Sequence, residues 1–171
     1  MGSHPLDSLT AAELSGTSAN LAREKDIDGG WRYASIILQE PPKAEVKQWK
    51  DGDPIVRRAL AVLWNKQSND VYEAVVNLTD DTLESWTHVP GVTPNFTVDE
   101  YHDCDVALRD NPQVREALAK RGVDPELVLF DLWTYGGAVI PEQWRDRRLG
   151  WVDIWKRATP NGNPYAHPVS G

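Results

Sequence analysis

The sequence predicts an α+β protein made of two consecutive units, each an α-helix packed on a four-stranded antiparallel sheet. One observation is a helix-start pattern, Leu-Thr-Ala-Ala-Glu-Leu at residues 9–14, which returns 87 residues later as Phe-Thr-Val-Asp-Glu-Tyr at residues 96–101. A second is the series of apolar and β-branched runs with short turns between these patterns, which is typical of an antiparallel meander. A third is the Pro-Gly segment at residues 90–94, which separates the repeats.

Length and composition exclude several classes of protein. The chain of 171 residues can form one large domain or two small ones. With 26 acidic and 18 basic residues its net charge is −8, which argues against a general nucleic-acid-binding surface. The single cysteine, Cys104, excludes an internal disulfide and a zinc site built from several cysteines. No apolar run approaches the roughly 18 residues of a membrane span, and no signal peptide begins the sequence, so we expect a cytoplasmic location.

The first helix is expected to run from Thr10 to about Lys25. Thr10 can accept a hydrogen bond from the third helical N–H, and Glu13 can reach back to the cap. Leu9 and Leu14 occupy the two positions of a hydrophobic staple, which fixes the direction in which the chain enters the helix.

The body of this helix is a poor helix former. Residues 15–18 read Ser-Gly-Thr-Ser, and the apolar stripe consists only of Leu14, Leu21 and Ala22. The helix is therefore expected to be loosely held on its sheet.

Four strands are expected in the first unit, at residues 31–38, 57–64, 71–78 and 82–89, because these runs are rich in β-branched and aromatic residues. The segment 43–54 is expected to be a polar connector between the first two strands. Short turns join the others, so neighbouring strands should pair antiparallel, and the helix should cover one face of the sheet.

The second unit is expected to begin with a helix over residues 97–109 and a further helix over residues 111–122. Pro112 stands at a permitted first-turn position of the latter. Strands are expected over residues 127–133 and 149–155.

The two units are expected to divide the chain into residues 1–92 and 93–171. Arg57-Arg58 and Arg147-Arg148 precede corresponding strands of the two units. Counted from the corresponding Tyr72 and Tyr165, the second unit is about 11 residues shorter than the first. We therefore expect the second sheet to lack its last strand, as in a truncated gene product.

No motif of a self-contained active site is found. His102 and Cys104 are metal-ligand types, but two positions apart on a helix they face different ways, so the acids around them are interpreted as partners of the helix dipole. His167, expected in a turn before Pro168, has no partner at metal-ligand spacing. A small enzyme that uses Asp131 or Asp153 as a base is an alternative, although outward-facing strand positions explain both acids.

Trp133 stands where the strand at residues 127–133 gives way to a loop. A rigid aromatic side chain at such a junction suits the lining of a ligand-binding surface, and a packed core tryptophan is the alternative interpretation.

Several motifs, taken in order along the chain, resemble the N-terminal part of copper-containing primary amine oxidases. They are His-Pro-Leu-Asp-Ser-Leu-Thr at 4–10, Glu-Pro-Pro-Lys at 40–43, Arg-Gly-Val-Asp at 121–124, Asp-Leu-Trp at 131–133 and Tyr-Ala-His-Pro-Val-Ser-Gly at 165–171. The sequence is most similar to the actinobacterial enzymes described as tyramine or histamine oxidases. The resemblance implies two cystatin-like α+β domains, called N2 and N3.

The resemblance implies that this segment has no catalytic residue and no metal ligand of its own. In the family a further domain holds copper and topaquinone and oxidises primary amines to aldehyde, ammonia and hydrogen peroxide. Neither the Asn-Tyr-Asp/Glu cofactor motif nor a His-x-His pair is found in these 171 residues. The expected partners are therefore the remainder of the oxidase chain and its primary amine substrate, with no nucleic acid and no membrane, and the isolated segment should be monomeric.

The same resemblance implies a role in the substrate channel. Positions that line the channel in similar enzymes correspond to Tyr101, Leu132 and Trp133; Leu132 departs from the usual proline. A stand-alone cystatin-like or nuclear transport factor 2-like binding or interaction module is the alternative function, on fold analogy alone.

Overall fold

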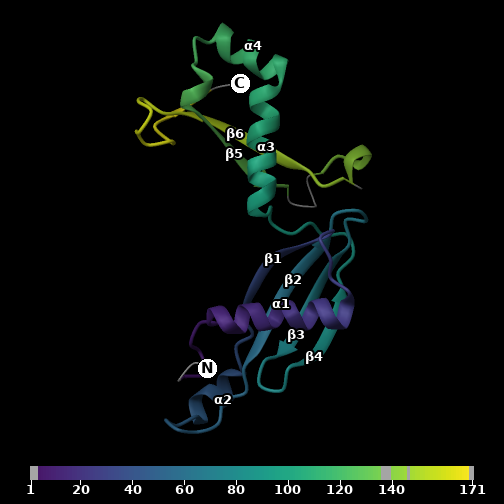
Figure 1. Cartoon of the computed structure of the whole chain (residues 1–171). Helices are drawn as coiled ribbons and strands as arrows, with labels where there is room; N and C mark the ends of the chain where they lie inside the picture. The colour runs from purple at the N-terminus through teal and green to yellow at the C-terminus, as the bar shows by residue number, and fades with distance from the viewer. Residues whose placement is uncertain (1–3, 136–139, 146, 170–171) are drawn as a thin grey trace. The chain divides into compact units, whose positions relative to one another are not determined.

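The computed structural model describes residues 4–135, 140–145 and 147–169 (Figure 1). The last two residues of the 165–171 motif lie outside the described residues. The chain divides into two compact units, Met1–Pro94 and Asn95–Gly171.

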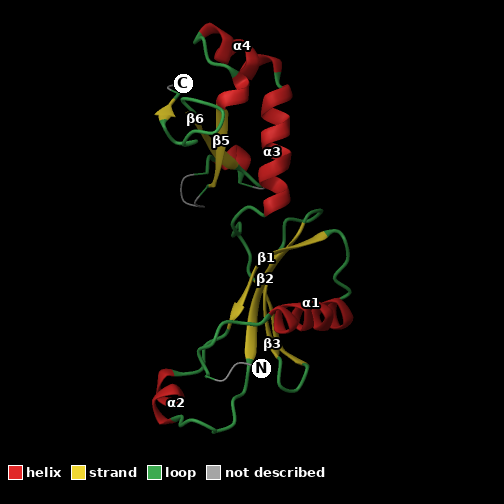
Figure 2. Ribbon diagram, turned by 60° about the vertical axis from the view of Figure 1, so that its left-hand side comes forward, coloured by secondary structure: helices red, strands yellow, loops and turns green. Residues whose placement is uncertain are grey.

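The first unit is a helix on a four-stranded antiparallel sheet, as the sequence predicted (Figures 1 and 2). The strands are hydrogen-bonded in the order β1-β2-β3-β4, and α1 lies across one face of the sheet. The elements are α1 (Ala11–Lys25), β1 (Trp31–Leu38), α2 (Lys43–Gln48), β2 (Arg58–Asn65), β3 (Val71–Asn77) and β4 (Thr82–His88).

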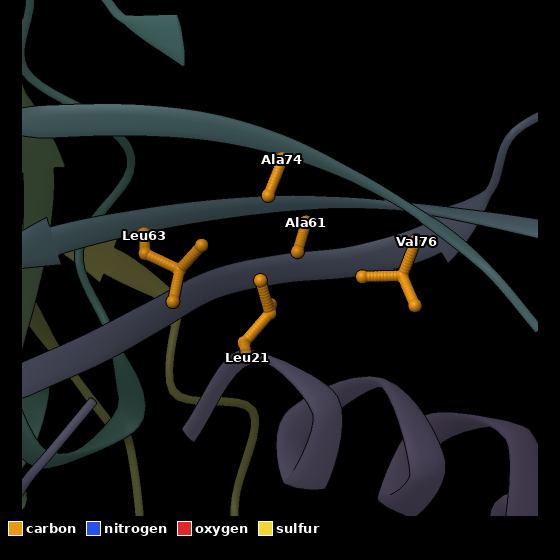
Figure 3. Packing of buried hydrophobic residues seen from close by; sticks show 5 residues of the cluster. All are labelled: Leu21, Ala61, Leu63, Ala74 and Val76. Carbon is orange, nitrogen blue, oxygen red and sulfur yellow. The ribbon is translucent and has the colours of Figure 1, made fainter. Parts of the chain in front are cut away.

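The core of the first unit lies between α1 and the two central strands (Figure 3). Alternate residues of β2 and β3 face the helix, and Ala61 lies directly opposite Ala74 at the centre of the sheet. Because these two side chains are single methyl groups, the helix can approach the strands closely. The buried cluster consists of Leu21, Ala61, Leu63, Ala74 and Val76.

The face by which α1 packs differs from the predicted apolar stripe. Thr17, Asn20 and Leu21 are fully buried, whereas Leu14 and Ala22 are exposed. Two of the three residues predicted for the apolar stripe, Leu14 and Ala22, are therefore wrong, and the buried face of the helix consists of Thr17, Asn20 and Leu21 instead.

Hydrogen bonds explain why small and polar side chains can be buried on the side of α1 that faces the sheet. The Thr17 hydroxyl donates to the carbonyl oxygen of Glu13 at 2.8 Å. The Asn20 amide donates to the carbonyl oxygen and to a carboxylate oxygen of Asp81, both at 2.9 Å. The Asn20 side-chain oxygen is buried and finds no partner among the described residues, so only the amide nitrogen of Asn20 and the Thr17 hydroxyl are satisfied on this face. Buried polar groups that find partners in this way cost little, and a narrow helix face packs against an alanine-lined sheet.

The helix α2 lies inside the segment predicted to be a polar connector. None of its six residues is buried, so the segment lacks the apolar periodicity by which a helix is recognised. Pro42 precedes it with φ of −52°, a backbone angle compatible with the start of a helical turn.

The second unit packs a helix pair on an antiparallel sheet with strand order β5-β6-β7 (Figure 2). The restart of the helix at Asn111 is confirmed, because its side chain accepts from the N–H groups of Gln113 and Val114. No helix in the described ranges is long and apolar enough to span a bilayer. The elements are α3 (Val98–Asp110), α4 (Pro112–Lys120), the 3₁₀ turn η1 (Pro125–Leu127), β5 (Val128–Thr134), the 3₁₀ turn η3 (Glu142–Trp144), β6 (Gly150–Lys156) and β7 (His167–Pro168).

The second sheet has three strands among the described residues, one fewer than the first, as expected. Its third strand is β7, so the assignment of His167 and Pro168 to a turn is wrong. β7 pairs only with Trp155 and Lys156, and two residues are too few to show an alternation pattern.

The core of the second unit is smaller than that of the first. Leu118, Val128 and Phe130 form its buried cluster, and Leu108 of α3 packs against them only partly buried. No residue of α3 is buried, in contrast to the three fully buried residues of α1.

One ion pair connects the start of the helix to the sheet in each unit. In the first, Arg57 stands directly before β2 with its side chain 1% exposed, and its Nε lies 2.9 Å from Oε1 of Glu13, the residue that completes the capping box. The same guanidinium donates to the carbonyl oxygens of Asp7 at 2.8 Å and Ser8 at 3.2 Å. Arg57 therefore joins the N-terminal segment, the helix start and the sheet.

The second unit repeats this arrangement. Arg148 precedes β6, and its Nε and Nη2 donate to the two carboxylate oxygens of Glu100 at 2.5 and 2.9 Å. Nη2 also donates to the carbonyl oxygen of Asn95 at 3.1 Å, and the guanidinium carbon lies 4.6 Å from the centre of the Phe96 ring.

Both carboxyl groups are more acidic than usual. The hydrogen bond from Arg57 is the main reason that the pKa of Glu13 falls to about 2, with Thr10 helping against the opposing effect of burial. Burial raises the pKa of Glu100, but hydrogen bonds from Arg148 and Thr97 outweigh burial and hold that pKa below its ordinary value. Both acids are thus held in the charged form that the arginines require.

We expect R57M to lower the free energy of unfolding of the first unit by about 3 kcal/mol, because it leaves the Glu13 carboxylate partly buried without its cation. R58M is the matched control: Arg58 pairs with Glu84 at 2.7 Å, but both side chains are 34% exposed, so its loss should cost about 1 kcal/mol or less. Urea unfolding followed by tryptophan fluorescence measures both. Equal losses for the two variants would contradict the account.

The low pKa of Glu13 predicts acid sensitivity. Because the folded-state pKa is about 2 and the ordinary value is 4.5, the ionised group stabilises the fold above about pH 4.5, and this contribution is lost as pH falls toward 2. Between pH 5 and pH 2 the wild-type chain should lose on the order of 2 kcal/mol more stability than E13Q, which cannot titrate at this position. Stability curves of the two proteins that run parallel over this range would show that the pair does not carry the effect.

Candidate functional site

Tyr101, the first predicted channel residue, lies in the first turn of α3. Thr97 and Glu100 close the capping box of this helix, and Arg148 holds Glu100, so the position of the turn is fixed from the sheet. The Tyr101 side chain is 44% exposed and meets the ring of Phe96 edge to face, with 6.4 Å between ring centroids. Tyr101 therefore presents an aromatic surface beside the helix start.

Leu132, the second predicted residue, faces the helical side of the sheet. The alternation along β5 sends Val128, Phe130 and Leu132 to this side, and Leu132 is only 7% exposed. Its Cδ1 and the Phe96 ring both crowd Gly150, where an added Cβ would lie 2.6 Å from each. A residue larger than glycine at position 150 would thus displace the side chains that connect Leu132 to the neighbourhood of Tyr101.

Trp133, the third predicted residue, projects from the opposite face of the sheet. Its side chain is 52% exposed, so the alternative of a packed core tryptophan is wrong. Directly across the strand pair lies Trp151, which is 54% exposed and approaches Tyr135 with 6.0 Å between ring centroids.

The structure thus gathers the three predicted residues at one end of β5, on two sides of the sheet. Tyr101 and Leu132 lie on the helical side, connected through Phe96, and Trp133 lies on the outer side. Sequence reasoning did not single out Phe96 or Trp151 as members of this group. Phe96 stood in the repeated helix-start pattern, but the pairing of Trp151 with Trp133 depends on a register that the intervening loop does not reveal.

The acidic cluster at residues 99–105 serves the helix rather than a metal. The Thr97 hydroxyl donates to Asp99, and Asp105 pairs with Arg109 at 2.7 Å. His102 is exposed, and burial, with the neighbouring Asp105 charge, raises the pKa of the half-buried Cys104 thiol.

No group of three His, Cys, Asp or Glu side chains in the part of the chain that the structure describes is arranged to hold a metal ion. The described residues therefore do not fit a copper ion. The other candidate acids, Asp131 and Asp153, oppose each other across β5 and β6 on the outer face, with Asp153 exposed.

The two units match two separate family models. Residues 10–86 match the AGAO-like N2 domain, and residues 99–171 match the copper amine oxidase N3 domain. Together these models account for most of the chain and for the order of its two units.

Similar proteins align with nearly the whole chain. A primary amine oxidase and a copper methylamine oxidase of Arthrobacter sp. (strain P1) are each 35% identical over 169 residues, which is 98% of this chain and 25% of theirs. Copper amine oxidase 1 of Schizosaccharomyces pombe is 32% identical over 98% of this chain and 24% of its own. The chain therefore spans about a quarter of the length of the curated relatives it matches.

The fold is also found in a solved structure. The crystal structure of a copper-containing benzylamine oxidase from Hansenula polymorpha superposes with a TM-score of 0.73 at 22% identity, over 97% of this chain and 27% of that one. At this identity the likeness shows the fold alone. With the two domain models and the relatives that align from end to end, it places the chain: it belongs to the copper amine oxidase family, of which it carries the N2 and N3 domains.

Proposed function

We propose that this N2–N3 region is the non-catalytic part of an amine oxidase and that its second unit lines the channel through which a primary amine reaches the active site. The observation that carries the proposal is the exposure of Trp133 on the outer face of the second sheet, with the exposed Tyr101 near the same end of β5 on the other side of the sheet. The remainder of the oxidase chain would supply the other wall.

In such an enzyme, copper and topaquinone, held by the remainder of the chain, would supply the oxidation of the amine to an aldehyde, with ammonia and hydrogen peroxide as further products. The residues described here hold neither group. Their part is to receive the amine, to strip water from its apolar portion and to direct it inward.

Aromatic side chains suit this task physically. The rings of Tyr101 and Trp133 bury an aryl group, and their faces attract an ammonium by a cation–π interaction of about 0.5–2 kcal/mol. The net charge of −8 also draws a cationic substrate toward the surface before contact.

We further propose that the substrate is an aryl-alkyl amine of the tyramine or histamine kind. Trp133 offers the largest ring surface at the proposed channel wall, which favours a substrate that has a ring of its own. The printed names of two relatives refer to methylamine and to benzylamine, amines without and with an aromatic ring.

The test is W133A in the complete oxidase. We expect kcat/KM for tyramine to fall about tenfold, since the loss of one ring contact is worth roughly 1–2 kcal/mol, while kcat/KM for methylamine and the KM for oxygen stay nearly constant. W144A, which removes an exposed tryptophan of the same unit that lies outside the proposed wall, is the control and should change neither amine.

Two results would contradict the channel proposal. One is an equal loss for tyramine and methylamine, which would indicate a structural role for Trp133. The other is no change for any amine, which would place the channel elsewhere.

A further inference from the structure

A cavity of about 250 Å³ lies in the first unit, beside α2. Three stretches of chain that are distant in the sequence line it: the N-terminal segment at Pro5, residues 41–46 at the start of α2, and residues 54–58 before and at the start of β2. The N-terminal segment and α2 lie at the same end of this unit in both views (Figures 1 and 2). The fold thus assembles the cavity from parts that meet only in the folded chain.

The walls of this cavity are apolar and rigid. Pro5, Pro41 and Pro54 contribute rings whose backbone φ is fixed, and Val46 adds a branched side chain. The segment that carries Pro5 is held by Arg57, whose guanidinium donates to the carbonyl oxygen of Asp7. Walls that are ordered before a ligand enters lose little conformational entropy on binding, which favours the uptake of an apolar group.

The helix α2 contributes to this cavity rather than to the core. None of its residues is buried, yet Trp49 at its end fixes it in place. The Trp49 ring meets the His4 ring edge to face with 4.9 Å between centroids, and its indole N–H donates to the carbonyl oxygen of Asp53 at 3.2 Å. These contacts connect the stretch that follows α2 to both the N-terminal segment and the approach to β2.

Two opposite charges, Glu45 and Arg58, line the same cavity. The exposed Glu45 carboxylate has no hydrogen bond or ion pair with the described residues. Arg58 donates from Nε to Glu84 at 2.7 Å, which leaves both Nη groups without a hydrogen bond in the described part of the chain. The hydrogen bond to Glu84 is the main reason that the pKa of Arg58 rises above its ordinary value, and the nearby Glu45 charge adds to this rise.

We propose that this cavity binds a free α-amino acid with an apolar side chain. Its ammonium group pairs with Glu45, its carboxylate accepts from the Nη groups of Arg58, and its side chain lies among the three prolines. A few placed polar groups in an apolar cavity are typical of small-molecule sites, and the volume suits a ligand smaller than a drug. The inference goes beyond the channel proposal and does not depend on it, since every residue involved belongs to the first unit.

Other occupants satisfy only one of the two charges. An amine without a carboxylate meets the positive charge of Arg58, and a carboxylic acid without an amino group meets the negative charge of Glu45. The end of a peptide chain brings an ammonium or a carboxylate, but not both. A free amino acid carries both charges on neighbouring atoms and therefore complements this cavity best.

The test titrates the ¹⁵N-labelled 171-residue chain with L-phenylalanine and follows the backbone amide signals of Val46 and Val56, which both line the cavity. Two probes with the same ring are controls: phenethylamine lacks the carboxylate, and 3-phenylpropionate lacks the amino group. We expect L-phenylalanine to bind with a Kd on the order of 1 mM, as suits a ligand of about a dozen non-hydrogen atoms. Each control probe should bind about fivefold more weakly.

Charge variants test the two polar contacts. E45Q and R58M should each weaken the binding of L-phenylalanine about fivefold, because each removes one charge-assisted contact. E73Q is the matched control for E45Q: it removes an exposed carboxylate of the same unit outside the cavity and should leave the Kd unchanged. This control separates the Glu45 contact from the general attraction of a chain with a net charge of −8 for ammonium groups.

A pair of phenylalanine variants tests the location of the ligand. V46F should fill the cavity and abolish the shift at Val56, and it should leave the chain folded because α2 has no buried residue. A44F adds the same ring at an exposed position of α2 outside the cavity and should leave the binding of L-phenylalanine unchanged.

Several outcomes would overturn the inference. Equal affinities for the three probes would show that neither charge is recognised, and tighter binding of phenethylamine than of L-phenylalanine would assign the cavity to an amine. The absence of shifts up to about 20 mM, or shifts at Val56 that persist in V46F, would show that the amino acid does not enter the cavity. None of these results bears on W133A, whose readout is amine selectivity in the complete oxidase, so failure here is distinguishable from failure of the channel proposal.

Discussion

The pairing of an arginine with the capping-box glutamate, buried at Arg57 and partly buried at Arg148, is the interaction on which both units depend. Arg57 connects three parts of the first unit that the chain brings together only on folding: the segment at residues 5–8, the start of α1 and the start of β2. An arginine is suited to this position because its five donors can satisfy carboxylate and carbonyl oxygens at once, and it stays charged when buried. The position of the start of α1 on its sheet is therefore fixed by the Arg57 guanidinium rather than by a broad apolar stripe on the helix.

The same interaction in the second unit determines where the proposed channel residues lie. Arg148 holds Glu100 and stacks on Phe96, and Phe96 in turn crowds Gly150 and Leu132. The start of α3, with Tyr101, is thus kept against the end of β5, from which Trp133 projects on the other side. No residue of α3 is buried. The contacts at the start of α3 therefore contribute more to the position of that helix than the corresponding contacts contribute to the position of α1.

The local parts of the fold could be predicted from the sequence, and the long-range parts could not. Thr10 and Glu13 predicted a helix start because capping acts over three residues, and the arginine doublets were recognised as a repeat. Their partners were missed, since 44 and 48 residues separate the members of each pair. The buried face of α1 was missed because Thr17 and Asn20 are polar. At the candidate site, the resemblance to the family supplied the three channel residues. Strand alternation alone could have placed Leu132 and Trp133 on opposite faces of the sheet. The cross-strand pairing of Trp133 with Trp151 depends on the register of β5 and β6, which the sequence does not reveal.

The central claim is that the N3-like unit presents its aromatic residues to an amine on its way to the active site. A crystal structure of the complete oxidase with a bound aryl-alkyl amine inhibitor tests this most directly. The account predicts that the aryl ring, or the channel leading to it, lies within van der Waals contact of about 4 Å of Trp133 or Tyr101. An inhibitor reached by a channel that touches neither residue would contradict it.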